Sequence, residues 1–237
     1  MNNQVSINHT IAKLRPQSAS RLCTSPEQHL SALEELVNTL THGLGLLLSI
    51  GGLSLLVILS SVHGTAWHVI SSSIYGASLV LLFAASTCYH AAPVSDAKRR
   101  LRVAEQALIF VLIAGTYTPF TLVILKAGWG WSLFGVVWGL AVGGIILNTI
   151  HFHRYPSISV VLYLGLGWLG LVTVFPLQDT LPLGGLTLLL TGGIAYSVGV
   201  IFLLWRKLHL NHAIWHIFVL IGSLCHYFTV LFYVVPQ

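Results

Sequence analysis

Charged residues are scarce in this chain of 237 residues: Asp, Glu, Lys and Arg together make up 7%, whereas hydrophobic residues make up 55%. A soluble globular domain carries about 25% charged residues. The scarcity of charge therefore predicts an integral membrane protein. The net charge of +5 does not indicate a nucleic-acid partner, because no stretch of the chain is both basic and polar enough to bind one.

Cysteine is also rare. The three cysteines, Cys23, Cys88 and Cys225, are scattered along the chain and form no Cys-x-x-Cys spacing. A disulfide framework needs several paired cysteines, and a thiolate metal site needs closely spaced ones. The sequence therefore argues against both kinds of site.

Long apolar stretches are what the sequence has instead. Seven of them are close to the ~20 residues that a helix needs to cross the hydrocarbon core of a bilayer. They cover residues 37–60, 67–90, 103–125, 129–149, 157–177, 182–205 and 213–235. We therefore predict an all-α protein with a bundle of seven transmembrane helices. Residues 1–25 are predicted to form a polar tail, and residues 26–237 an interfacial helix followed by the membrane domain.

Basic residues are distributed unevenly over the predicted loops. If the N-terminus is cytoplasmic, ten of the eleven Lys and Arg residues fall in inner segments and only Lys126 falls in an outer loop. The positive-inside rule favours this orientation, which places the C-terminus outside. Residues 1–30 contain no apolar core of a secretory signal, so the first apolar stretch is expected to act as an uncleaved insertion signal.

A pair of histidines opens the last apolar stretch, in the segment Asn211-His212-Ala213-Ile214-Trp215-His216. Two residues at i and i+4 lie on one face of a helix, about 6 Å apart along its axis. This is the spacing with which one helix offers two imidazoles to one metal ion. Because such a pair also arises by chance, its interpretation depends on where the other ionisable residues fall.

Other polar residues are predicted to fall near the same membrane boundary. His90 ends the second apolar stretch, Ser86 lies one turn deeper, and Glu105 lies in the first turn of the third. If the bundle brings these helices together, His90, His212 and His216 supply three nitrogen ligands. Three protein ligands with an open fourth position are typical of a catalytic zinc site.

Glu105 and Ser86 are the predicted catalytic residues of such a site. An acid inside a membrane span is costly, which favours a pairing or catalytic role for Glu105, with a salt bridge to Arg102 or to a neighbouring Lys as the alternative. Zinc can lower the pKa of a bound water to about 7, and Glu105 would hold or deprotonate that water. Ser86 would orient the water or donate to a developing oxyanion. Entry from the lipid phase predicts an amide or ester of a lipid as the substrate.

Three further polar features have structural or functional interpretations. Glu35, Asn38 and His42 stack along the first apolar stretch, where a hydrogen-bond ladder to neighbouring helices and a functional role remain equally open. His226 lies about 15 Å deeper than the histidine pair and is rotated by about 80° from it, so we expect it to bond to a neighbouring helix. Pro119 interrupts the third stretch and predicts a kink.

Four ordered motifs resemble those of a known family: Glu35-x2-Asn38-x3-His42-x2-Gly45, Ser86-x3-His90, Ala114-Gly115-Thr116-Tyr117-Thr118-Pro119-Phe120 and His212-x3-His216. The chain resembles the bacterial hemolysin III proteins, the prokaryotic branch of the progestin and adipoQ receptor family, in a wider group with the alkaline ceramidases. The resemblance covers the chain from about residue 31. It implies a seven-helix, multi-pass protein of the bacterial inner membrane, with Zn2+ bound near the cytoplasmic face at His90, His212 and His216.

The resemblance also bears on function. By similarity to the related receptors and ceramidases, the resemblance implies hydrolysis of lipid amides. Membrane lipids would then be the substrates. The family usually has an Asp-His pair where this chain has Glu105-Gln106, and the longer glutamate could bind the metal directly. Three functions follow: a zinc-dependent membrane amidohydrolase or esterase, a pore or channel as the family name and the Pro119 kink indicate, or a receptor-like zinc protein without turnover.

Overall fold

The computed structural model describes residues 26–125, 128–150, 156–171, 177 and 180–236. The polar tail predicted for residues 1–25 lies outside them. Contacts divide the chain into two units, residues 1–33 and residues 34–237. The second unit carries the site described below.

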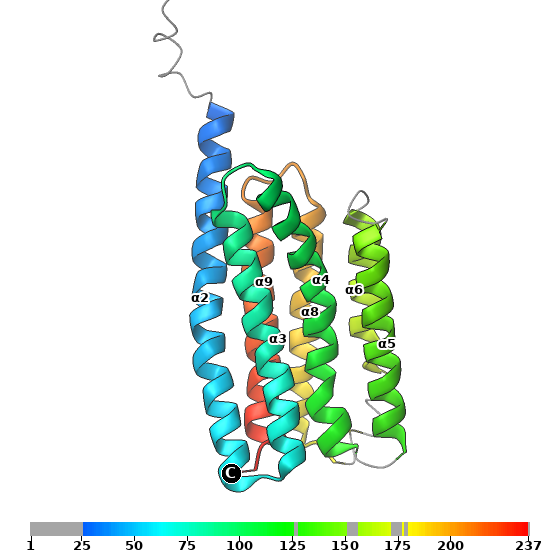
Figure 1. The fold of residues 1–237 in the computed structure, drawn as a ribbon. Coiled ribbons are helices and arrows are strands. Elements are labelled where there is room, and N and C mark those ends of the chain that lie inside the picture. The colour runs from blue at the N-terminus through cyan, green and yellow to red at the C-terminus, as the bar shows by residue number, and fades with distance from the viewer. Residues whose placement is uncertain (1–25, 126–127, 151–155, 172–176, 178–179, 237) are drawn as a thin grey trace, which may run out of the picture. The chain divides into compact units, whose positions relative to one another are not determined.

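Helices make up the regular structure of the described part, which contains no strand (Figure 1). In chain order they are α2 (Pro26–His63), α3 (Ala66–Ala91), α4 (Asp96–Pro119), the π-helical turn η2 (Phe120–Ile124), α5 (Trp129–Ile150), α6 (Pro156–Trp168), α8 (Leu183–Leu204) and α9 (Asn211–Tyr233). Figure 1 shows α3 beside α4 and α8 beside α9, and these are the most extensive helix pairings.

Six of these helices are long and apolar enough to cross a membrane: α2, α3, α4 with η2, α5, α8 and α9. A helix satisfies its backbone hydrogen bonds internally, which is the condition for crossing hydrocarbon. The fifth predicted span appears as α6, an apolar helix of 13 residues, and residues 172–176 after it lie outside the described part. The prediction of a multi-pass α-helical membrane protein is confirmed. The count of seven spans and the orientation stay predictions.

The helix geometry changes at Pro119, where the sequence predicted a kink. Pro119 is the last residue of α4, and the backbone continues directly into the π-helical turn. The N–H of Leu125 donates to the carbonyl of Phe120 at 2.9 Å, which is the i to i+5 pattern of a π-helix. Proline has no N–H and therefore cannot continue the regular ladder of the preceding turn.

Two apolar clusters hold the second unit together. The larger one contains Leu56 of α2, Tyr75 of α3 and Val230 of α9, all fully buried. The smaller one joins α4, α5 and α6 through Phe110, Val137 and other residues. Burial of this apolar surface is not a strong driving force in lipid, so close packing of small residues against large ones must contribute.

Gly144 of α5 shows how close that packing is. A Cβ atom added there would lie 2.4 Å from a ring carbon of Phe110, whereas a Cβ atom added at the neighbouring Gly143 would have no atom within 4 Å. We predict that Gly144→Leu destabilises the protein in detergent by about 1–3 kcal/mol, because the buried Phe110 ring has to move. The measurement is the thermal unfolding midpoint.

Gly143→Leu is the matched control for this prediction, and its midpoint should stay at the wild-type value. Equal midpoints for the two variants would contradict the close α4–α5 contact.

Candidate functional site

Four side chains from three helices meet at one end of the second unit. His90 lies in the last turn of α3, Glu105 lies in α4, and His212 and His216 are one turn apart at the start of α9. Each offers one ligand atom, and the four atoms lie within 4.8 Å of one another. His90 and His216 are buried, with 5% and 1% of their surface exposed. Three imidazoles and one carboxylate in this arrangement could hold one metal ion.

The three imidazole rings face a common centre. Their centroids are 5.1 Å apart for His90 and His212, 4.9 Å for His90 and His216, and 4.6 Å for His212 and His216. The Nε2 atom of His90 is buried without a hydrogen-bond partner, and it lies 3.7 Å from Oε1 of Glu105. Buried polar atoms without partners are rare in folded proteins, and a bound cation would provide the missing partner.

A local backbone feature fixes the start of α9. Leu210 precedes the helix with φ 59°, in the left-handed region that side chains other than glycine rarely adopt. The Asn211 side chain then donates to the carbonyl of Leu203 at 3.0 Å, which ties the start of α9 to the end of α8. These contacts place His212 in the first turn of α9, next to His90.

Ser86 links Glu105 to α2. Its hydroxyl donates to Oε1 of Glu105, and its oxygen lies 2.6 Å from Nδ1 of His42. Because the hydroxyl proton is used on the carboxylate, His42 must donate from Nδ1 to Ser86. The His42 ring stacks on the His216 ring with centroids 3.5 Å apart, and its Nε2 atom is buried without a partner. Among the described residues, no salt bridge joins Glu105 to Arg102 or to a lysine, the alternative that the sequence left open.

His90 is also held from its other side. Its Nδ1 atom lies 2.8 Å from Oε2 of Glu35, whose Oε1 atom accepts from Lys98 Nζ at 3.1 Å. The sequence indicated Glu35 and His42 through their spacing on one face of the first span, and left their role open. Nothing in the sequence indicated that Lys98 reaches the site, because it lies 63 positions from Glu35 in a predicted basic loop.

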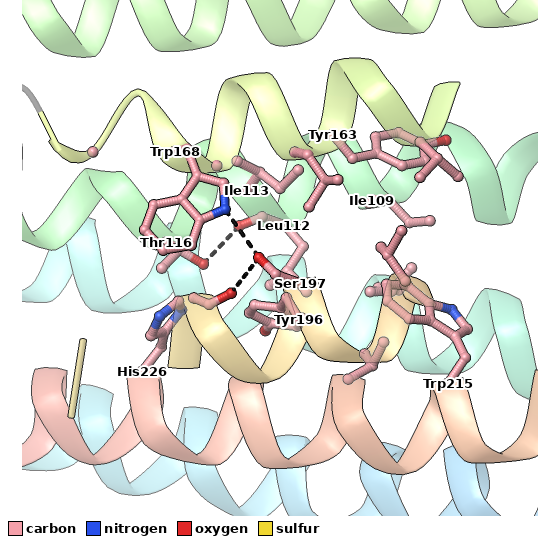
Figure 2. A pocket seen from close by; sticks show the side chains of 18 of the residues that line it. Ile109, Leu112, Ile113, Thr116, Tyr163, Trp168, Tyr196, Ser197, Trp215 and His226 are labelled. Carbon is pink, nitrogen blue, oxygen red and sulfur yellow. Dashed lines mark hydrogen bonds between the residues drawn. The ribbon is translucent and has the colours of Figure 1, made fainter. Parts of the chain in front are cut away.

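A cavity of about 540 Å³ begins at the cluster and continues between the helices. Its lining includes Glu105 and the α9 histidines at one end, and residues such as Phe120 and Leu177 elsewhere. Figure 2 shows the stretch around Trp168, with Thr116 and Ser197 close by. The Trp168 indole donates to Ser197 at 2.9 Å, and Thr116 donates to the carbonyl of Leu112 at 2.8 Å. These polar groups are therefore already paired, and since most of the lining is apolar, the cavity suits a largely apolar ligand.

His226 lies in the lining of the same cavity but outside the cluster. Its Nε2 atom bonds to the carbonyl of Leu189 on α8 at 3.0 Å. The prediction that this histidine bonds to a neighbouring helix is confirmed.

The structure thus brings together all five predicted site residues. His90, His212 and His216 form one group with Glu105, and Ser86 bonds to that glutamate. Their roles as metal ligands and catalytic groups stay predictions.

The chain is similar to known proteins over most of its length. A family model described as haemolysin-III related matches residues 30–227. Hemolysin-3 of Bacillus cereus is 46% identical over 203 residues, which are 86% of this chain and 93% of that protein. The Hemolysin-3 homolog of Bacillus subtilis (strain 168) is 46% identical over 202 residues, which are 85% of this chain and 95% of that protein.

A more distant relative is the Monocyte to macrophage differentiation factor of Homo sapiens, 30% identical over 205 residues and covering 83% of each chain. No solved structure matches the chain.

The buried hydroxyl of Ser86 provides a test of the polar network. We predict that Ser86→Ala destabilises the protein by about 1–3 kcal/mol, because Glu105 and His42 would both lose a partner in a buried place. Thermal unfolding in detergent measures the effect. Ser54→Ala is the control, because the Ser54 hydroxyl is exposed and bonds only within its own helix. If both variants unfold at the same midpoint, the network does not have the role described here.

Proposed function

The chain belongs to the haemolysin-III related family, and on that premise we propose that it is a zinc-dependent hydrolase of a lipid amide or ester. The observation that carries the proposal is the position of a three-histidine, one-glutamate cluster at the end of an apolar cavity. The resemblance to hemolysin III proteins that the four sequence motifs indicated is confirmed.

The residues of the cluster fit a zinc ion. Imidazole nitrogens are ligands that zinc prefers, and among the described residues no cysteine belongs to the cluster. The Nε2 atom of His90 has no hydrogen-bond partner and would be one of the ligand atoms. His90, His212 and His216 would hold the ion, and Glu105 is close enough to join them or to contact a water beside them.

The chemistry divides between the ion and the side chains. Bound zinc supplies a Lewis acid that polarises the carbonyl of the substrate and lowers the pKa of water. Glu105 then accepts a proton from the attacking water through a carboxylate oxygen and returns it to the leaving nitrogen or oxygen, as the bond from the carbonyl carbon to that atom breaks. Ser86 donates to Oε1 and so keeps the carboxylate aimed at the cluster.

The cavity favours a substrate with a long apolar chain. An acyl chain placed between the helices would put its amide or ester carbonyl at the cluster, where the apolar lining gives way to Glu105 and the histidines. The substrates would then be membrane lipids. We place the protein in the bacterial inner membrane with the cluster at the cytoplasmic face, in keeping with the uneven distribution of its basic residues.

A lytic pore is the second candidate, and the name Hemolysin-3 of the Bacillus relatives favours it. Two observations on the described residues weigh against it. The salt bridges and the histidine cluster gather near one end of the helices, and the polar groups around Trp168 are paired with one another. A path for ions would need polar groups or water along the whole span.

The proposal predicts that metal and turnover depend on the same histidines. His212→Ala should lose bound zinc and, in parallel, hydrolysis of labelled ceramides and phospholipids. The two imidazoles that remain in the variant would hold zinc far less tightly than three. Glu105→Gln should keep zinc and lose turnover by at least 10²-fold, the usual contribution of a general base. Zinc is measured by mass spectrometry of the purified protein, and turnover in detergent.

His209→Ala is the control for both variants, because His209 is an exposed histidine outside the cluster. Turnover retained by Glu105→Gln would remove Glu105 from the mechanism. Wild-type protein that binds zinc but cleaves no lipid would favour the receptor-like alternative, and metal-independent dye leakage from liposomes would favour the pore.

The cavity makes a separate prediction about chain length. Gly193 lines the cavity, and a Cβ atom added there would lie 3.8 Å from the Trp168 ring, in ordinary contact. Gly193→Leu should therefore lower kcat/KM for a long-chain substrate about tenfold, the loss expected when a side chain takes the place of a few methylenes, while bound zinc stays unchanged. Gly139→Leu is the control, since Gly139 is exposed and faces open space. Equal kinetics for both variants would place the acyl chain elsewhere.

A further inference from the structure

The second nitrogen of His90 is held by an acid from another helix. Nδ1 of His90 lies 2.8 Å from Oε2 of Glu35, and a carboxylate can only accept a hydrogen bond. Nδ1 therefore carries the proton, which leaves the lone pair of the neutral ring on Nε2. That is the buried atom without a partner, and it faces Glu105 and the α9 histidines.

Glu35 is itself fixed in place. Lys98 Nζ donates to its Oε1 atom at 3.1 Å, so that each carboxylate oxygen has its own donor. The same ammonium group donates to the carbonyl of Ala92 at 3.1 Å and lies 5.0 Å from the centre of the Tyr89 ring. A residue of α4 thus clamps the α2 carboxylate beside the last turn of α3, where His90 is located.

We propose that Glu35 is a positioning residue for the metal ligand His90, with Lys98 acting through it. The inference rests on the proposed function, because it requires a metal at the cluster. A carboxylate behind a metal-bound histidine fixes the ring orientation and raises the basicity of the nitrogen that binds the metal. Loss of such a partner typically costs 10- to 100-fold in metal affinity.

The competing interpretation is that the pair of Glu35 and His90 only stabilises the fold. The exposed fractions of the two side chains distinguish this interpretation from the positioning role. The Glu35 side chain is 37% exposed, so water can solvate its carboxylate when the pair is broken, and the loss of its charge should cost little folding stability. The His90 side chain is only 4% exposed, so the orientation of its ring depends on the few polar groups that reach it. The main effect of the pair should therefore fall on His90 as a ligand and not on the fold.

Zinc affinity of Glu35→Gln tests the inference. The variant keeps the size of the side chain and an acceptor oxygen but removes the charge. We expect its dissociation constant for zinc to rise 10- to 100-fold. The constant is measured by competition with a chromophoric chelator, on the purified full-length protein in detergent. The unfolding midpoint of the metal-free protein should not change, a result that a structural role would not give.

Glu34→Gln is the matched control. It removes the same charge from the adjacent position, and Glu34 has no hydrogen bond or salt bridge to His90 among the described residues. Its zinc affinity should stay within about twofold of wild type, since only the hydrogen bond between Glu35 and His90 carries the larger effect. If Glu35→Gln does not fold, Lys98→Met replaces it and should raise the dissociation constant in the same direction.

The outcomes are separable. An unchanged affinity in Glu35→Gln, an equal loss in Glu34→Gln, or a fall in affinity that accompanies a fall in the metal-free unfolding midpoint would overturn the positioning role and leave the zinc proposal standing. A wild-type protein that binds no zinc would overturn both.

Discussion

Polar side chains inside a membrane-spanning helix need partners within the protein, since hydrocarbon supplies neither hydrogen bonds nor opposite charges. In the unit formed by residues 34–237, acids and histidines of α2, α3, α4 and α9 meet this requirement by contacting one another. None of these helices could satisfy its own polar residues alone. Their convergence at one end gives these groups partners inside the protein, and it also assembles the candidate site.

The network satisfies most of its members but leaves atoms free at its centre. Glu35, Lys98 and Ser86 all have partners, whereas Nε2 of His90 and Nε2 of His42 have none. Leaving such atoms buried and unpaired costs about 1–3 kcal/mol each. For Nε2 of His90, an ion bound at the cluster would offset this cost.

The cavity gives the polar cluster its context. Around Trp168 the hydroxyl and indole groups bond to the protein itself, so the space between the helices offers apolar contact. The cluster is therefore the polar end of a space whose lining is mostly apolar. α2 packs closely on its neighbours through glycines such as Gly45, where an added Cβ atom would meet Phe83 and Leu220 at 2.7–2.8 Å. It contributes Leu56 to the larger apolar cluster and also delivers Glu35 and His42 to the site.

The sequence by itself determined the helical membrane architecture, because about 20 consecutive apolar residues are stable in lipid only as a helix. It also indicated His212 and His216 as a pair, because residues at i and i+4 share a helix face. These are properties of single helices. Which helices are neighbours depends on packing between residues far apart in the chain, so only the tertiary structure decided that Lys98 reaches Glu35 across 63 positions and that His42 stacks on His216.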